Sequence, residues 1–130
     1  MLRLTLHIAR APGEVAPRAC DCGFCTRHGA AWVSDAAGRL EIAVGDPALA
    51  RHYRQGSNTA RFLFCGGCGV LVAVLLDDDR CYAAVNARCL DEAAALAQPI
   101  TVSPQRLAAE EKVARWRQLW TADVRWNLPS

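Results

Sequence analysis

The chain begins with a strict alternation of apolar and polar residues. Positions 2, 4, 6 and 8 are leucine or isoleucine, and positions 3, 5 and 7 are arginine, threonine and histidine. A period of two places every second side chain on one face of an extended strand. Short apolar, β-branched or aromatic runs follow, separated by Gly, Pro, Asp and Asn, at residues 31–34, 40–44, 59–64, 70–76 and 81–86. The pattern predicts about six short strands and a mainly β fold.

One of these runs differs from the others because it has no polar positions. Residues 70–76 read Val-Leu-Val-Ala-Val-Leu-Leu, which is typical of a strand buried on both faces. Three consecutive aspartates at 77–79 predict a turn into residues 81–86. We expect these two strands to form the central hairpin.

The last third of the chain predicts one long helix. Ser103 is a favourable N-cap residue, and Pro104 then occupies the first helical position. Val113, Trp116 and Trp120 fall on one helical face, which predicts that this C-terminal helix packs against the sheet. Residues 91–96 predict a single helical turn, and the cysteine-rich residues 18–29 predict a loop.

Length and charge narrow the class of protein. With 130 residues, 52% of them apolar, residues 1–130 are expected to form one domain with a single core. A net charge of +2 provides no basic field for nucleic acid, and no apolar run approaches the roughly 20 residues that cross a membrane. Arg3 and His7 interrupt what a signal peptide would need as an apolar stretch, so we expect a cytoplasmic protein.

The chain has seven cysteines, and an odd number argues against a framework in which all of them are paired in disulfides. Five lie in two clusters: Cys20-x-Cys22-x-x-Cys25, and Cys65-x-x-Cys68 followed by a glycine. Such spacing lets sulfurs surround one ion, and we favour zinc over an iron–sulfur cluster or a redox-active pair. Cys81 and Cys89 are interpreted instead as small buried hydrophobic residues.

These motifs resemble the glutathione-dependent formaldehyde-activating enzymes, whose domain is shared with centromere-protein-V-like proteins. The resemblance is carried by four blocks in the family's order, at residues 20–29, 53–57, 61–69 and 85–91, which include Ser57 and Arg61. It implies a β-tent, which is a set of small coiled antiparallel sheets. It also implies a catalytic zinc held by Cys20, Cys22 and Cys25.

In that family a second, structural zinc uses the Cys-x-x-Cys pair together with an N-terminal Cys-x-Cys. Here the pair would be Cys65 and Cys68, but no cysteine precedes Cys20. The second site is then vacant, borrows a ligand such as His7, or merges with the first. We predict one tightly held zinc rather than two.

The activity implied by the resemblance is addition of glutathione to formaldehyde, a reaction of the carbon–sulfur lyase class. A zinc with three thiolates keeps one position open for a thiol, which it deprotonates on binding. Arg27, within the first block, is assigned to a glutathione carboxylate. His28 is a weak candidate for moving a proton, because a single loop histidine is more often simply exposed.

Two alternatives remain open. The chain could be a non-catalytic, zinc-stabilised binding module in which Cys22, Cys25, Cys65 and Cys68 close one tetrahedral site. It could also be an enzyme of the same family that acts on a different thiol or aldehyde. The C-terminal arginines and tryptophans could form a nucleic-acid surface, but the small net charge argues against that partner.

Overall fold

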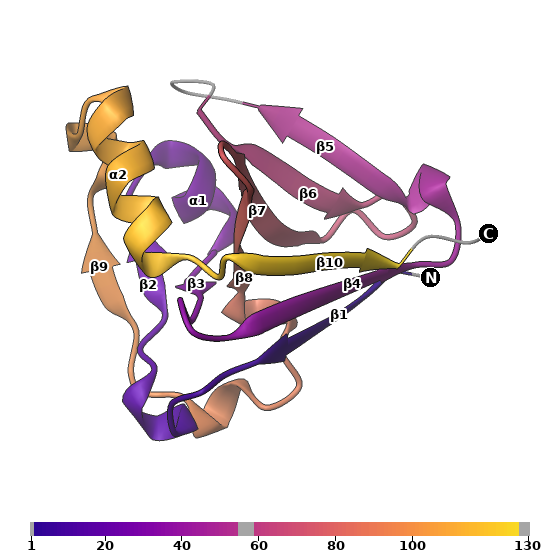
Figure 1. Ribbon diagram of the computed structural model, residues 1–130, viewed down its shortest axis with the longest axis horizontal. Helices are drawn as coiled ribbons and strands as arrows, with labels where there is room; N and C mark the ends of the chain where they lie inside the picture. Colours follow the sequence, from indigo (N-terminus) through magenta and orange to yellow (C-terminus); the bar gives the residue numbers. More distant parts are fainter. Residues whose placement is uncertain (1, 55–58, 128–130) are drawn as a thin grey trace.

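A computed structural model describes residues 2–54 and 59–127 of the chain as a mainly β fold with two sheets (Figure 1). The strands are β1 Leu2–His7, β2 Arg18–Cys20, β3 Trp32–Val33, β4 Arg39–Val44, β5 Ala50–Arg54, β6 Arg61–Cys65, β7 Leu71–Asp77, β8 Cys81–Asn86, β9 Ile100–Val102 and β10 Asp123–Asn127. The α-helices are α1 Gly23–His28 and α2 Ala109–Leu119, and short 3-10 turns are η1 Pro12–Glu14, η2 Pro47–Leu49, η3 Ala87–Cys89, η4 Ala93–Ala95 and η5 Pro104–Arg106. Neither α-helix in these ranges has the length and apolar character needed to cross a membrane.

The smaller sheet has the strand order β1-β4-β10. β1 runs antiparallel to β4, whereas β10 runs parallel to it. As the alternation predicts, every second residue of β1 and β4 turns inward, and Leu40 and Ile42 are fully buried. These side chains pack against Leu63, Leu75 and Val85 of the larger sheet to form one core.

The larger sheet has the order β5-β6-β7-β8-β3-β2-β9, with β7 and β8 near its centre. β7 is buried on both faces, which confirms the prediction for the run without polar positions. Leu75 faces the smaller sheet, while Val74 and Leu76 face a second core that contains Trp32 and Trp120. The helices lie on the side of this second core, away from the strand ends at Leu2 and Asn127 (Figure 1).

The predicted start of the long helix is wrong. Ser103 does not cap a helix, because its hydroxyl donates to the carboxylate of Asp21 instead. Pro104 begins only the short turn η5, and α2 starts six residues after Ser103, at Ala109. There Glu111 accepts a hydrogen bond from the backbone N–H of Ala108 at 3.0 Å. The predicted packing face is confirmed, since Val113, Trp116 and Trp120 all contact the second core.

The predicted loop at residues 18–29 is also wrong, because it holds β2 and α1. Cys22 takes the N-cap position of α1, where its sulfur accepts the backbone N–H of Cys25 at 3.4 Å. Gly29 ends the helix in the left-handed conformation with φ 62°, which glycine adopts without strain. The helical turn predicted at 91–96 is present as η4. The short strands β2, β5, β9 and β10 were not predicted. β2 and β9 have only three residues each and β5 is mostly polar, whereas the alternation of polar and apolar residues in β10 was a signal that was overlooked.

A group of polar residues joins the end of α2 to the larger sheet and to the segment between β3 and β4. The Thr121 hydroxyl accepts the backbone N–H of Asp35 at 3.1 Å and donates to the carbonyl of Asp35 at 3.0 Å. The Thr121 backbone exchanges two hydrogen bonds of 2.9 Å with Ala83 of β8. Next to it, the Ser34 hydroxyl donates to the carbonyl of Leu119 at 2.8 Å and accepts from the guanidinium of Arg18 at 2.6 Å.

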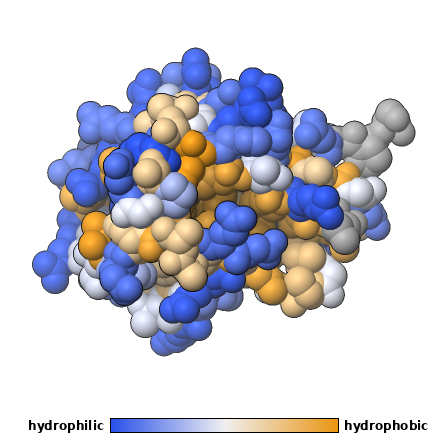
Figure 2. Space-filling model, turned by 90° about the horizontal axis from the view of Figure 1, so that it is seen from below, coloured by the Kyte–Doolittle hydropathy of each residue, from blue (hydrophilic) through white to orange (hydrophobic). Residues whose placement is uncertain are grey.

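The surface of the molecule carries some apolar side chains among the charged ones. Figure 2 shows a face on which apolar residues form a band between charged residues. Among the described residues Tyr53, Val70 and Ile100 are large apolar side chains with high exposure. Scattered exposed hydrophobic residues are ordinary in folded proteins, so this band alone assigns no function.

The Thr121→Val variant tests the polar junction. It preserves the side-chain shape but leaves the buried N–H of Asp35 without its acceptor, so the free energy of unfolding should fall by about 1–3 kcal/mol. Urea denaturation followed by circular dichroism measures the change. The matched variant Thr5→Val, at an exposed position of β1, should change stability by less than about 0.5 kcal/mol. Equal effects of the two variants would contradict this role of Thr121.

Candidate metal centre

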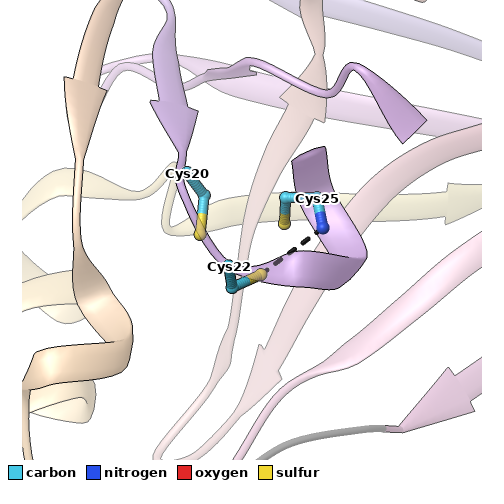
Figure 3. Close-up of side chains that lie close together, drawn as sticks. All are labelled: Cys20, Cys22 and Cys25. Atoms are coloured by element: carbon cyan, nitrogen blue, oxygen red, sulfur yellow. Dashed lines mark hydrogen bonds between the residues drawn. The ribbon is translucent and has the colours of Figure 1, made fainter. Parts of the chain in front are cut away.

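Three cysteines converge where β2 passes into α1. Cys20 is the last residue of β2, Cys22 caps α1 and Cys25 lies in its first turn. Their sulfur atoms all lie within 4.8 Å of one another, and Figure 3 shows them facing a common space. The sequence motif therefore predicted the correct group of three.

The backbone around the triad is fixed from a distant part of the chain. The backbone N–H of Asp21 donates to the carbonyl of Val102 in β9 at 3.0 Å. The carboxylate of Asp21 accepts hydrogen bonds from Ser103 and, at 3.1 Å, from Gln105. Both the backbone and the side chain of Asp21 are therefore hydrogen-bonded, which fixes the position of the neighbouring residues Cys20 and Cys22.

Burial and hydrogen bonding make the three thiols unequal. The Cys25 thiol donates to the sulfur of Cys20, and this bond lowers the pKa of Cys20 to about 6 even though burial acts in the opposite direction. The same bond and the burial of Cys25, which is 2% exposed, raise the pKa of Cys25 strongly. Near neutral pH the triad thus already carries one thiolate that a cation can use.

The donor set fits a thiophilic metal ion. Sulfurs bound tetrahedrally at a Zn–S distance near 2.3 Å stand about 3.8 Å apart. The observed separations, none above 4.8 Å, need only small side-chain rotations to reach that value. Cys20 and Cys22 are half-buried and Cys25 is buried, so such an ion would be shielded on the protein side. The triad can therefore hold a metal ion.

A cavity of about 410 Å³ opens beside the triad, and all three cysteines line it. Its walls include four aromatic side chains, Trp32 and Phe62 from the sheet and Trp116 and Trp120 from α2 and its C-terminal end. Three basic residues also line it: Arg18, Lys112 and Arg115. The helical pattern predicted that Trp116 and Trp120 pack in the core. Arg115 was considered only as part of a nucleic-acid surface, and Arg18 and Lys112 were given no role. The sequence did offer one signal for the basic residues on α2. Arg115 and Trp116 follow Lys112 by about one helical turn, so all three lie on the same side of the helix.

Other residues singled out from the sequence do not line this cavity. Arg27 is exposed on α1 and is not among the lining residues. The exposed ring of His28 lies beside that of Phe24 in a tilted arrangement, with 4.7 Å between the ring centroids. Arg61 pairs with Asp77 on the neighbouring strand, with 2.7 Å from Nε to the carboxylate, which is a scaffold contact. Ser57 lies outside the described residues.

The second cysteine pair forms a tight turn after β6. The backbone N–H groups of Cys68 and Gly67 donate to the sulfur of Cys65 and lower the pKa of that thiol. Gly69 adopts φ 76° and its N–H donates to the carbonyl of Cys65 at 2.7 Å. Within residues 2–54 and 59–127, the only group of three or more potential ligand side chains is the Cys20 triad, so Cys65 and Cys68 gain no third ligand.

The positions of Cys65, Cys68 and His7 decide between the metal sites that the sequence left open. A closed site of Cys22, Cys25, Cys65 and Cys68 is not assembled in the described part of the chain. His7 does not substitute as a ligand, since its ring bonds to Glu41 at 3.2 Å.

Cys81 is half-buried, and burial raises its pKa, in keeping with the predicted role of a small apolar residue. The same interpretation is wrong for Cys89, which is exposed and donates its S–H to the carbonyl of Leu71 at 3.3 Å. Its position directly after β8, at the surface, explains the difference.

Comparison with known proteins adds information about the fold. No protein-family model and no curated protein matches the chain. Among solved structures, the chain is similar to the crystal structure of a Rhodobacter sphaeroides protein that was a Northeast Structural Genomics target. The TM-score is 0.53 with 20% sequence identity, and the match covers 97% of this chain and 92% of the other. At this identity the similarity concerns the fold, and nearly the whole length of both chains shares it.

Proposed function

We propose that the chain is a zinc-dependent enzyme that adds a small-molecule thiol to a small aldehyde. The thiol would be glutathione and the aldehyde formaldehyde in the family that the motifs resemble, which places the reaction in the carbon–sulfur lyase class. The observation that carries the proposal is the convergence of three cysteine sulfurs at the wall of a sizeable cavity. A purely structural metal site would be closed by a fourth protein ligand.

The donor set also supports zinc as the metal. Thiolate ligands select soft or borderline ions such as zinc over magnesium or calcium. When bound, zinc would supply an open position at which a thiol ionises near neutral pH. Cys20, Cys22 and Cys25 would hold the ion. A reducing compartment such as the cytoplasm would keep these thiols free, so we include a cytoplasmic location in the proposal.

The chain's own residues would act mainly by bringing the two reactants together. The thiol sulfur bonds to the carbonyl carbon, the carbonyl π electrons move to oxygen, and the thiol proton ends on that oxygen. Atoms and electrons balance without an oxidant or a reductant. Three thiolates soften the acidity of the ion, so holding both reactants in one cavity should supply most of the acceleration.

The reaction can be followed by exchange NMR with ¹³C-formaldehyde and glutathione. Zinc-loaded protein should increase the exchange between free formaldehyde and its glutathione adduct in proportion to protein concentration. Cys22→Ser should abolish the increase, because a neutral hydroxyl replaces one of three thiolate ligands. Serine remains a good N-cap residue, so α1 should persist. The control Cys89→Ser changes an exposed thiol outside the cavity and should behave as wild type.

The proposal fails if zinc-loaded wild type leaves the exchange unchanged. It also fails if Cys22→Ser retains full zinc content by elemental analysis. Changes in groups that merely support metal ligands reduce metal affinity roughly 10–100-fold, so loss of a direct ligand should reduce it at least as much.

The number of metal ions is a separate prediction. Because Cys65 and Cys68 lack a third ligand in the described residues, purified protein should contain one zinc per chain. Cys65→Ser should keep that zinc and lower the free energy of unfolding by only about 1–2 kcal/mol, as an ordinary substitution does. Elemental analysis and urea denaturation measure both quantities. Two zinc ions per chain, with one lost in Cys65→Ser, would contradict the prediction.

A further inference from the structure

Two of the arginines that line the cavity beside the cysteine triad, Arg18 and Arg115, are not paired with a carboxylate of the described residues. Arg18 is half-buried, and its guanidinium donates to the neutral hydroxyl of Ser34 at 2.6 Å. Within the described ranges no carboxylate lies within ion-pair distance of Arg18 or of Arg115. Arg10, by contrast, does reach a carboxylate, with 3.8 Å between its Nε and Asp35.

The charges closest to Arg18 make its position less favourable. Arg10 donates to the backbone carbonyl of Ser34 at 3.1 Å, beside the hydroxyl that Arg18 contacts, and Arg115 lines the same cavity as Arg18. A partly buried cation without a counter-ion is costly for the fold, and proteins usually pair such groups. An unpaired arginine is therefore most easily explained by an anionic ligand, and arginine is well suited to carboxylates because it can donate two parallel hydrogen bonds.

The remaining walls show what such an anion would carry. Trp116 and Trp120 stack with 4.6 Å between their ring centroids and 12° between their planes. Both line the cavity, as do Trp32 and Phe62. A volume of about 410 Å³ is within the range of small-molecule sites, which combine apolar walls with a few polar anchors. Formaldehyde or an inorganic anion would leave these aromatic walls without a partner.

We propose that the cavity binds a small organic anion, namely a carboxylate on an apolar or aromatic body. Arg18 and Arg115 bind the carboxylate, and the body packs against Trp116 and Trp120. Binding of this anion requires neither the metal nor the reaction. Where the proposed function also holds, the anion is one of its two reactants, and the substrate is an acidic thiol or acidic aldehyde with an apolar body.

Isothermal titration with 3-phenylpropionate tests whether the cavity binds an aromatic carboxylate. Two control compounds separate its parts: 3-phenylpropanol has the same aromatic body without the charge, and acetate has the carboxylate without the aromatic body. The full-length protein should bind 3-phenylpropionate at least about tenfold more tightly than either control compound. Rising salt should weaken that binding, because it screens the attraction between exposed charges. Equal binding of the alcohol, or no binding of 3-phenylpropionate, overturns the proposal.

Variants on one helix locate the charge. Arg115→Gln changes an exposed residue at the edge of the cavity and should lower the affinity for 3-phenylpropionate about tenfold. The matched control Arg117→Gln also removes a positive charge from α2. The guanidinium nitrogens of Arg117 lie 3.4 and 3.5 Å from carboxylate oxygens of Asp78 and Asp79, and Arg117 does not line the cavity. This variant should leave the affinity unchanged. An unchanged affinity in Arg115→Gln, or an equal loss in both variants, overturns the assignment.

One further titration separates this site from the reaction. Cys22→Ser should still bind 3-phenylpropionate, since the carboxylate is held by arginines rather than by the metal ligands. Binding in this variant together with no thiol addition by wild type would refute the proposed function alone. Loss of binding in Cys22→Ser, with circular dichroism unchanged, would refute the metal-independent anion site.

Discussion

The buried hydrogen bonds between Thr121 and Asp35 hold together the parts of the molecule that form the cavity. Thr121 follows α2 directly, and its backbone also pairs with Ala83 in the larger sheet. The chain is therefore fixed at the C-terminal end of α2, and the aromatic face of the helix is set against the sheet. Without this junction the wall that faces the cysteines would have no fixed distance from them.

The same junction positions a charged side chain. Ser34 precedes Asp35, and its hydroxyl connects the last turn of α2 to the guanidinium of Arg18. Arg18 begins β2, the strand that ends at Cys20. One strand of three residues thus carries a cation at one end and a thiol of the candidate metal centre at the other, and both line the same cavity. Changes in the buried junction should be felt at both.

The triad shows how one atom can serve both folding and chemistry. The sulfur of Cys22 caps α1 in place of the usual serine, threonine, aspartate or asparagine oxygen. An N-terminal cap lies where the helix backbone presents unpaired N–H groups, and these favour negative charge. The atom that caps α1 is therefore also one of the three sulfurs of the candidate metal centre.

The sequence predicted those features that depend on local pattern. The alternation in β1, the fully apolar β7 and the three-cysteine motif each appear in a few adjacent residues, and the structure has all three. Features decided by distant contacts were missed. The Ser103 hydroxyl, which was predicted to cap the helix, donates instead to the carboxylate of Asp21. Arg18 of β2 and Arg115 of α2 line one cavity only because the fold brings these two elements together. Neither contact leaves a trace in a short window of sequence.

The three-stranded sheet has a mechanical consequence. β1 starts at Leu2 opposite Val44, and β10 ends at Asn127 opposite Ala43, so the outer ends of both edge strands flank the same end of β4. Force applied at those two ends would not slide the strands lengthwise against many hydrogen bonds at once. It would peel β1 and β10 away from β4 one bond at a time, starting at the end of the molecule farthest from the helices (Figure 1). Under tension this sheet would open like a zip, while α1, α2 and the cavity between them would be the last parts to bear the load.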